Sequence, residues 1–136
     1  MTEVRFPDGT IVRGSSLFER YKNTEWTQYG LYLDPRWEPE SPSDFITWPD
    51  YGLPTNGVEA AETIRLAFDA ARSGTNVEIG CAGGVGRTGT VIACMAILAG
   101  VARDEAVNWV RRNYHPHAVE TDEQERWVME FGQSKL

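Results

Sequence analysis

A cysteine and an arginine stand six positions apart in a glycine-rich segment, Gly80-Cys81-Ala82-Gly83-Gly84-Val85-Gly86-Arg87-Thr88-Gly89. Glycines let the backbone curl so that successive N–H groups point into one concavity, and a helix that begins here adds its positive end. Arg87 carries the planar fork that bonds two phosphoryl oxygens at once. The segment therefore predicts a loop that holds a phosphate dianion, and the same positive field favours a thiolate at Cys81.

Each residue of this loop has an expected role. Cys81 is the expected nucleophile, and Arg87 is expected to clamp the phosphate and stabilise the charge that spreads over its oxygens during transfer. The hydroxyl of Thr88 is expected to hydrogen-bond the sulfur and help it leave, with a first-turn helix bond as the alternative. The backbone between them is expected to bind the substrate phosphate: Ala82, Gly83, Gly84, Val85 and Gly86.

The range 84–89 also matches the dinucleotide fingerprint G-x-G-x-x-G. That fingerprint belongs to a unit in which a second strand follows the helix and carries an acidic residue about twenty positions further on. Here the helical pattern after the loop is followed by another helical pattern, and the second strand is missing. The phosphate-transfer interpretation therefore ranks above dinucleotide binding.

An aspartate upstream is suited to donate a proton. Asp50 lies between two aromatic residues in Trp48-Pro49-Asp50-Tyr51, on a loop bounded by Pro and Gly residues. Closure of such a loop removes water from the carboxyl group, which can then act as a general acid. A plain Pro-Asp turn is the alternative interpretation of these residues taken singly.

Hydrophobic periodicity and turn residues predict the elements that must position this chemistry. The predicted strands lie within 4–12 as a hairpin around Asp8-Gly9, and at 29–33, 44–47 and 76–79. The predicted helices contain 60–71, 88–99, 104–112 and 121–131. This order predicts one α/β domain over 1–136, a sandwich with a central mixed sheet flanked by helices. The loop then lies at the carboxyl end of a strand, where such sheets bind ligands.

Composition limits the function classes. The chain has 136 residues, of which 41% are hydrophobic and 24% charged, as expected for a globular protein. Its formal charge of -7 argues against a nucleic-acid or membrane surface, so phosphate recognition must be local. The first residues have no signal-peptide pattern and no segment has the length of a membrane span, which favours a cytoplasmic location. With two cysteines only, a disulfide framework is not expected.

The chain resembles the protein tyrosine phosphatases, including dual-specificity members, over roughly residues 45 to 131. Trp48-Pro49-Asp50 is similar to their mobile acid loop, 81–88 to their C-x5-R-[S/T] loop, and 120–124 to their glutamine loop. The resemblance implies that Cys81 attacks phosphorus, Asp50 protonates the leaving group, and Gln124 positions the water that hydrolyses a cysteinyl phosphate. It implies no metal or organic cofactor. The implied substrates are phosphorylated proteins or small phosphate monoesters, with phosphotyrosine favoured and dual specificity open.

The chain departs from the family pattern at two positions. Gly80 stands where most members have histidine, and Glu120 stands where tyrosine-specific members usually have glutamine. Gln124 also fits a capping box with Thr121 that would simply start a helix. Pocket depth depends on residues 14 to 40, which carry no family motif.

Other assignments stay open at this point. One alternative is a catalytically silent phospho-residue binder, and another is a phosphatase for inositol phosphates, phosphoinositides or RNA 5′ phosphates. A low-molecular-weight phosphatase has its loop at the start of the chain, the reverse of the order found here. His115 and His117 are too few for a metal site, and Cys94 is expected in the core.

Overall fold

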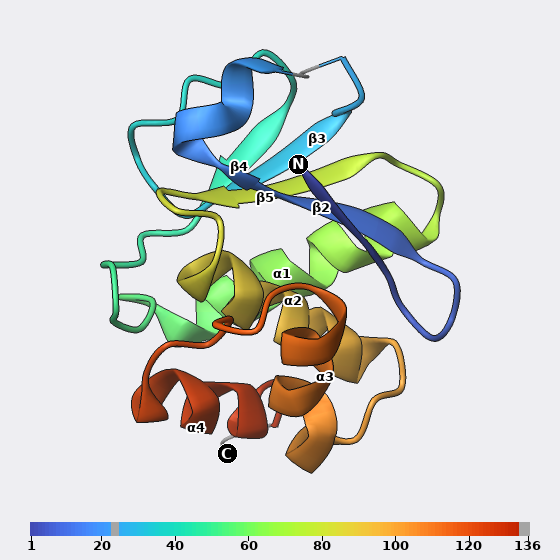
Figure 1. Ribbon diagram of the computed structural model, residues 1–136, viewed down its shortest axis with the longest axis vertical. Coiled ribbons are helices and arrows are strands. Elements are labelled where there is room, and N and C mark those ends of the chain that lie inside the picture. Colours follow the sequence, from blue (N-terminus) through green and yellow to red (C-terminus); the bar gives the residue numbers. More distant parts are fainter. Residues whose placement is uncertain (23–24, 134–136) are drawn as a thin grey trace.

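A mixed sheet of five strands forms the centre of the computed structural model, which describes residues 1–22 and 25–133 (Figure 1). The strand order is β1-β2-β5-β3-β4. β1 pairs antiparallel with β2, and the other neighbours are parallel. The strands are β1 Thr2–Arg5, β2 Ile11–Ser16, β3 Tyr29–Tyr32, β4 Ser43–Phe45 and β5 Val77–Cys81.

The four α-helices of the described residues lie on one side of this sheet, where α1 and α2 contact its strands and α3 and α4 pack on α2 (Figure 1). α2 contacts the other three helices and also β5, so it is the centre of the helical layer. No helix in the described part of the chain has the length and apolar character needed to cross a membrane. The helices are α1 Gly57–Arg72, α2 Gly86–Leu98, α3 Ala106–Asn113 and α4 Asp122–Glu130, with short 3-10 helices η1 Leu17–Lys22 and η2 Arg103–Glu105.

The predicted α/β class and mixed central sheet are confirmed, with shifts at element ends. β5 continues to Cys81, beyond the predicted end at 79, because Gly80 and Cys81 pair with Ser15 and Ser16 of β2. α2 begins at Gly86 rather than at 88, so the arginine lies in its first turn. Glycines in the sequence suggested a longer loop, but strand pairing and helix winding continue through them.

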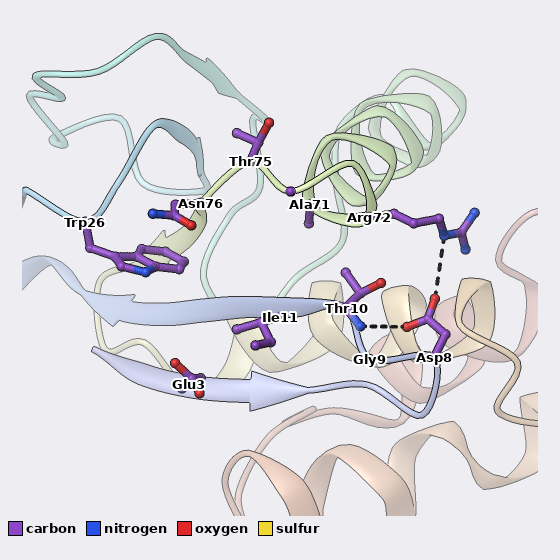
Figure 2. Close-up of a pocket in the computed structure, with 11 residues that line it drawn as sticks. Glu3, Asp8, Gly9, Thr10, Ile11, Trp26, Ala71, Arg72, Thr75 and Asn76 are labelled. Carbon is purple, nitrogen blue, oxygen red and sulfur yellow. Dashed lines mark hydrogen bonds and ion pairs between the residues drawn. The ribbon is translucent and has the colours of Figure 1, made fainter.

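The β1–β2 hairpin turns where the sequence predicted it. Gly9 has φ 89°, and the N–H of Thr10 donates to Oδ1 of Asp8 at 3.0 Å. The other carboxylate oxygen of Asp8 lies 3.5 Å from Nε of Arg72, at the end of α1 (Figure 2). Because Ile11 begins β2 and Cys81 ends β5, this turn and the cysteine lie at opposite ends of the sheet.

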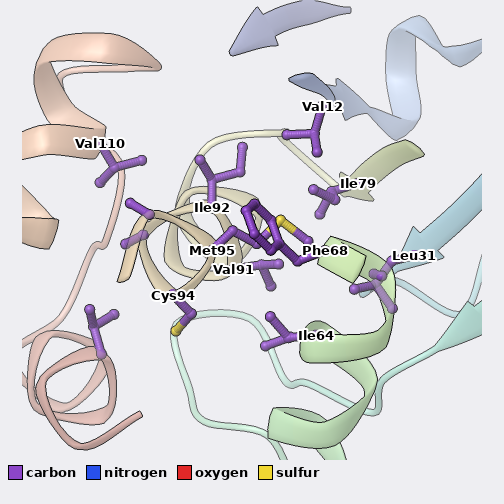
Figure 3. Close-up of a cluster of buried hydrophobic side chains, with 14 of the residues drawn as sticks. Val12, Leu31, Ile64, Phe68, Ile79, Val91, Ile92, Cys94, Met95 and Val110 are labelled. Atoms are coloured by element: carbon purple, nitrogen blue, oxygen red, sulfur yellow. The ribbon is translucent and has the colours of Figure 1, made fainter. Parts of the chain in front are cut away.

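The main core lies between the sheet and the helices. Val77 and Ile79 of β5 point toward the helices and are fully buried, as the alternation of a strand requires. Phe68 of α1 meets Phe6 edge to face, with ring centroids 5.4 Å apart. Figure 3 labels side chains from the strands and from α1, α2 and α3 in this layer: Val12, Leu31, Ile64, Phe68, Ile79, Val91, Ile92, Cys94, Met95 and Val110.

The opposite face of the sheet holds a buried carboxylate. Glu78 of β5 accepts hydrogen bonds from the hydroxyl groups of Ser15 at 2.6 Å, Tyr32 at 2.6 Å and Thr27 at 3.3 Å. Several donors compensate for the water that burial removes. Trp37 stacks on Tyr32 with ring centroids 4.4 Å apart and covers this network from outside.

The helix–sheet core predicts a large effect of truncating Phe68. Phe68→Ala is expected to lower the free energy of unfolding by about 3–5 kcal/mol, because it opens a cavity in a closed core. The measurement is urea unfolding followed by circular dichroism. Leu66 lies on the same helix with 58% of its surface exposed, so Leu66→Ala should change stability by less than about 0.5 kcal/mol. Equal effects would contradict this description of the core.

Candidate active site

The loop between β5 and α2 curls around the sulfur of Cys81. Cys81 is only 2% exposed, and the N–H of Gly84 donates to its Sγ at 3.2 Å. Gly84 has φ 71°, and a Cβ there would lie 2.9 Å from backbone atoms of Ser15. Both the conformation and the close approach to β2 require glycine at this position.

Two carbonyl groups of the loop are bound by groups outside it. The carbonyl oxygen of Ala82 accepts from the N–H of Leu17 at 3.2 Å and the hydroxyl of Ser16 at 2.9 Å. The carbonyl oxygen of Gly84 accepts from the hydroxyl of Tyr114, whose pKa is raised by burial and by the nearby Cys81. With these two carbonyls bound outside the loop and the N–H of Gly84 directed at the sulfur, the loop has the start of an arrangement that binds anions.

The guanidinium of Arg87 is buried and bound along one edge. Its Nη1 donates to the carbonyl oxygens of Leu33 at 2.9 Å and Trp48 at 2.7 Å, and Nη2 lies 3.6 Å from Oδ2 of Asp34. Nε lies 3.6 Å from Oδ1 of Asp50 and has no hydrogen-bond partner among the described residues. One edge is therefore fixed by the protein, whereas Nε is buried and has only the carboxylate of Asp50 as a charged neighbour.

The sequence did not indicate the ion pair that borders this arginine. Asp34 follows β3, and both its oxygens accept from Arg36, at 2.9 Å from Nε and 2.9 Å from Nη2. The hydrogen bonds from Arg36 and the charges of Arg36 and Arg87 lower the pKa of Asp34 to about 2. Since β3 and β5 are parallel neighbours, residues after β3 reach the same edge of the sheet as Cys81. That shared edge is the signal by which Asp34 and Arg36 could have been found.

The aspartate loop lies over the guanidinium. Trp48 is buried, and its Nε1 donates to the carbonyl oxygen of Gly52 at 2.7 Å. Tyr51 has φ 61°, a conformation that costs free energy for a residue with a side chain. The Asp50 side chain is 56% exposed. The predicted acid therefore stands at the mouth of the site, on a loop anchored on both sides of it.

Gln124 is fully buried beneath this loop. Its Nε2 donates to the carbonyl oxygen of Gly52 at 3.0 Å, and its Oε1 accepts from the N–H of Glu120 at 2.8 Å. Its own N–H donates to the hydroxyl of Thr121 at 3.1 Å, which caps α4. The capping alternative is thus present, and both polar atoms of the amide are bound by the protein.

Glu120 lies closer to the open side. A Cβ on Gly86 would overlap its carboxylate, so this group lies directly against the start of α2. Burial and the nearby Asp50 raise the pKa of Glu120, and Arg87 offsets part of this effect. The structure therefore brings this carboxyl group near both Asp50 and Arg87.

The remaining predicted residues are found as follows. Thr88 is fully buried, and its hydroxyl has no hydrogen-bond partner among the described residues. Gly83 is exposed at the tip of the loop. Cys94 is buried in the core, as predicted, and burial raises its pKa. Within residues 1–22 and 25–133 no three His, Cys, Asp or Glu side chains cluster in a way that would hold a metal ion.

A cleft of about 370 Å³ opens beside the cysteine loop. Its walls combine apolar side chains with both members of the Asp34–Arg36 pair and both Asp50 and Arg87. Among the apolar members, the ring of Phe45 is 47% exposed, so it offers a flat surface to a ligand. The lining residues are Asp34, Pro35, Arg36, Phe45, Ile46, Thr47, Trp48, Pro49, Asp50, Ala82 and Arg87.

The structure explains the glycine found where relatives have histidine. A Cβ on Gly80 would lie 2.5 Å from Cζ2 of Trp37, because the indole ring packs flat against the strand at this point. The ring occupies the space that a side chain at 80 would need. Trp37 thereby holds the segment that carries Asp34 and Arg36 against the strand that carries Cys81.

This contact predicts that Gly80→Ala lowers the free energy of unfolding by about 1–3 kcal/mol through overpacking. In a Trp37→Leu background the loss should be smaller, because the smaller side chain leaves room for the new methyl group. Urea unfolding of the four proteins gives the coupling. Gly83→Ala is the control, since nothing lies within 4 Å of a Cβ there. An equal loss in both backgrounds would refute the steric explanation.

A family profile matches the larger part of the chain. The family described as "Swiss Army Knife protein, DSP-PTPase phosphatase domain" matches residues 36–128. Two uncharacterised proteins of Methanocaldococcus jannaschii, MJECL20 and MJ0215, are 39% identical over 99 residues and 37% identical over 94 residues. These matches cover 70% and 66% of this chain, but 63% and 55% of the relatives. The chain therefore spans about three fifths of the length of these curated relatives.

Solved structures share the fold over nearly the whole chain. Tk-PTP in its active form superimposes with a TM-score of 0.75 at 26% identity, covering 97% of both chains. Kinase associated phosphatase, with serine in place of its catalytic-site cysteine, has a TM-score of 0.75 at 16% identity and covers 96% of this chain and 92% of its own. PTPMT1 in complex with PI(5)P has a TM-score of 0.65 at 14% identity, covering 96% and 94%.

Proposed function

We propose that this chain, which belongs to the DSP-PTPase phosphatase domain family, hydrolyses phosphate monoesters through a cysteinyl-phosphate intermediate. Residues 1–136 act as one phosphatase domain, and a cytoplasmic location remains the expectation. The observation that carries the proposal is the buried Nε of Arg87, which has no hydrogen-bond partner among the described residues and lies 3.6 Å from Oδ1 of Asp50. Arg87 stands in the first turn of α2, at the other end of the loop that begins at Cys81.

In the first step the thiolate of Cys81 attacks phosphorus in line with the ester oxygen. The S–P bond forms as the P–O bond to the leaving group breaks, and Asp50 gives its proton to that oxygen. The loop N–H groups and Nε of Arg87 bind the equatorial oxygens, where charge is spread in the transition state. Because two carbonyl groups hold Nη1 of Arg87, the guanidinium needs little reorganisation to reach its position in the transition state.

In the second step water attacks the phosphorus of the cysteinyl phosphate. The S–P bond breaks, Asp50 accepts a proton from the water, and Thr88 donates a hydrogen bond to the departing sulfur. Neither step uses a metal or a cofactor. Because both amide atoms of Gln124 already bind protein groups, Glu120 is the better placed of the two to orient the water.

The cleft favours an aryl ester. Phe45 and Pro49 give exposed apolar surface beside the phosphate loop, which suits the ring of phosphotyrosine better than a short aliphatic side chain. Phosphotyrosine in a protein or a small aryl phosphate is therefore the favoured substrate, and activity on phosphoserine or phosphothreonine is allowed. Kinase associated phosphatase, whose catalytic site contains a cysteine, has the same fold and supports the assignment of the nucleophile.

The deciding experiment measures phosphate release from an aryl phosphate between about pH 4.5 and pH 8 with a chelator present. Wild type should give a bell-shaped profile, because Cys81 must be ionised while Asp50 carries a proton. Cys81→Ser should abolish turnover. Asp50→Asn should lower kcat by about 10²–10⁴-fold and remove the fall in rate at high pH.

Two controls make this result specific. Cys94→Ala removes the other thiol, and Asp122→Asn removes an exposed carboxylate of α4. Both variants should leave turnover in place. Binding of phosphate by a folded wild type that shows no turnover would favour the silent phospho-residue binder. A chelator-sensitive activity would exclude the proposed mechanism.

The proposed role of Glu120 predicts a separate effect on the second step. Glu120→Gln should leave the initial burst of released alcohol intact and slow the steady-state rate, because only hydrolysis of the cysteinyl phosphate is affected. In wild type the rate of this hydrolysis should rise with pH as Glu120 loses its proton. The rise should occur at a higher pH than is usual for a carboxyl group, because the pKa of Glu120 is raised. Stopped-flow measurement at several pH values checks both, with Glu123→Gln as control. A reduced burst with an unchanged pH profile would exclude this role.

A further inference from the structure

We propose that Arg36 forms a second anion site beside the phosphate cradle. The domain then also accepts compact phosphate monoesters that carry another phosphate or carboxylate group close to the scissile one. This proposal rests on the proposed phosphatase function and adds a substrate class to it. It concerns an arginine outside the cysteine loop, on the segment that follows β3.

The carboxylate of Asp34 joins the two arginines. Its Oδ2 lies 2.9 Å from Nη2 of Arg36 and 3.6 Å from Nη2 of Arg87. The two Nη2 atoms can therefore be no further apart than the sum of these distances. Arg36 thus stands next to the guanidinium that is proposed to hold the scissile phosphate.

Arg36 keeps donors free for a ligand. Asp34 binds only its Nε and one hydrogen of Nη2, and a guanidinium has further N–H groups on its outer edge. The side chain is 61% exposed and lines the same cleft as Arg87 and Ala82. A bound anion would thus meet N–H groups of Arg36 that the protein does not use.

The charges around the cleft favour a second anion. Arg36 and Arg87 are the basic side chains among the described residues that line it, facing the carboxyl groups of Asp34 and Asp50. Asp34 stays ionised at ordinary pH because its pKa is about 2, and Asp50 must carry a proton for the first step. In that reactive form the side chains that line the cleft carry two positive charges and one negative charge, and the thiolate of Cys81 adds a negative charge inside the loop.

The guanidinium of Arg36 is held before any ligand arrives. Besides the paired hydrogen bonds, the N–H of Arg36 donates to Oδ1 of Asp34 at 2.9 Å, and the N–H of Trp37 donates to the carbonyl of Asp34 at 3.2 Å. Trp37 in turn packs on Gly80 in the strand of the nucleophile. A preorganised donor loses little conformational entropy on binding, which raises its affinity.

The close spacing sets the class of ligand. Groups on neighbouring carbon atoms, such as vicinal phosphates, can reach Arg87 and Arg36 together. In a phosphotyrosine peptide the aromatic ring holds the phosphate away from the backbone, so a flanking acidic side chain is less suited to reach Arg36. We therefore assign the second anion to the same small molecule that carries the scissile phosphate.

The test uses calorimetric binding to the Cys81→Ser variant of the 136-residue chain, which removes turnover from the readout. Methylenebisphosphonate, with two anionic groups, should bind more tightly than methylphosphonate, with one. Adding Arg36→Ala should weaken bisphosphonate binding by at least about tenfold and leave methylphosphonate binding nearly unchanged. Arg65→Ala on α1, a partly exposed arginine that is also in an ion pair, is the matched control.

Equal affinity of the Cys81→Ser protein for the two ligands would overturn the second site. An equal loss of affinity for both ligands in Arg36→Ala would also overturn it, because Arg36 would then act only by positioning Arg87. A peptide side chain is the other possible source of the second anion. Two peptides test this source, one with aspartate and one with asparagine directly after the phosphotyrosine. An Arg36-dependent preference confined to the aspartate peptide would contradict the small-molecule assignment. Wild-type turnover of an aryl phosphate, measured in parallel, reports on the phosphatase function itself and distinguishes its failure from that of the second site.

Discussion

The buried guanidinium of Arg87 is the constraint on which the rest of the site depends. A charged group at 4% exposure is tolerated only if carbonyl or carboxylate groups replace its water. Here they come from two separate segments: Leu33 and Asp34 directly after β3, and the loop of Trp48 and Asp50. Satisfying one arginine therefore brings together the phosphate loop, the acid loop and the outer wall of the cleft.

Close approach around the cysteine loop requires small residues. Gly84 touches the backbone of β2, Gly86 leaves room for the carboxylate of Glu120, and Gly80 leaves room for the indole of Trp37. The last contact leaves an aromatic ring from another segment in the space that a side chain at position 80 would need. The consequence is that the loop preceding β4 is joined to the strand of the nucleophile, and Arg36 is held at the cleft.

The acid loop is anchored at several points and strained at one. Arg87 binds the carbonyl of Trp48, and both Trp48 and Gln124 bind the carbonyl of Gly52. Tyr51, between the anchors, has a positive φ. A loop that must admit substrate and then close would have to break some of these bonds, and the strain at Tyr51 lowers the cost of leaving this conformation. Gln124 therefore links α4 to the loop that carries the proposed acid.

The sequence alone determined the features that follow from local pattern: the hairpin at Gly9, the helices, the strand ending at a glycine-rich turn, and the candidate trio of Cys81, Arg87 and Asp50. Those features depend on periodicity, turn residues and spacing along the chain. Tertiary structure alone decided that Trp37 covers Gly80, that the amide of Gln124 is occupied, and that Asp34 and Arg36 border the cleft. Such contacts join residues far apart in sequence. Parallel strands bring Asp34, Arg36 and Trp37 to the edge of the sheet that carries Cys81, and the packing of α4 brings Gln124 to the loop at Gly52.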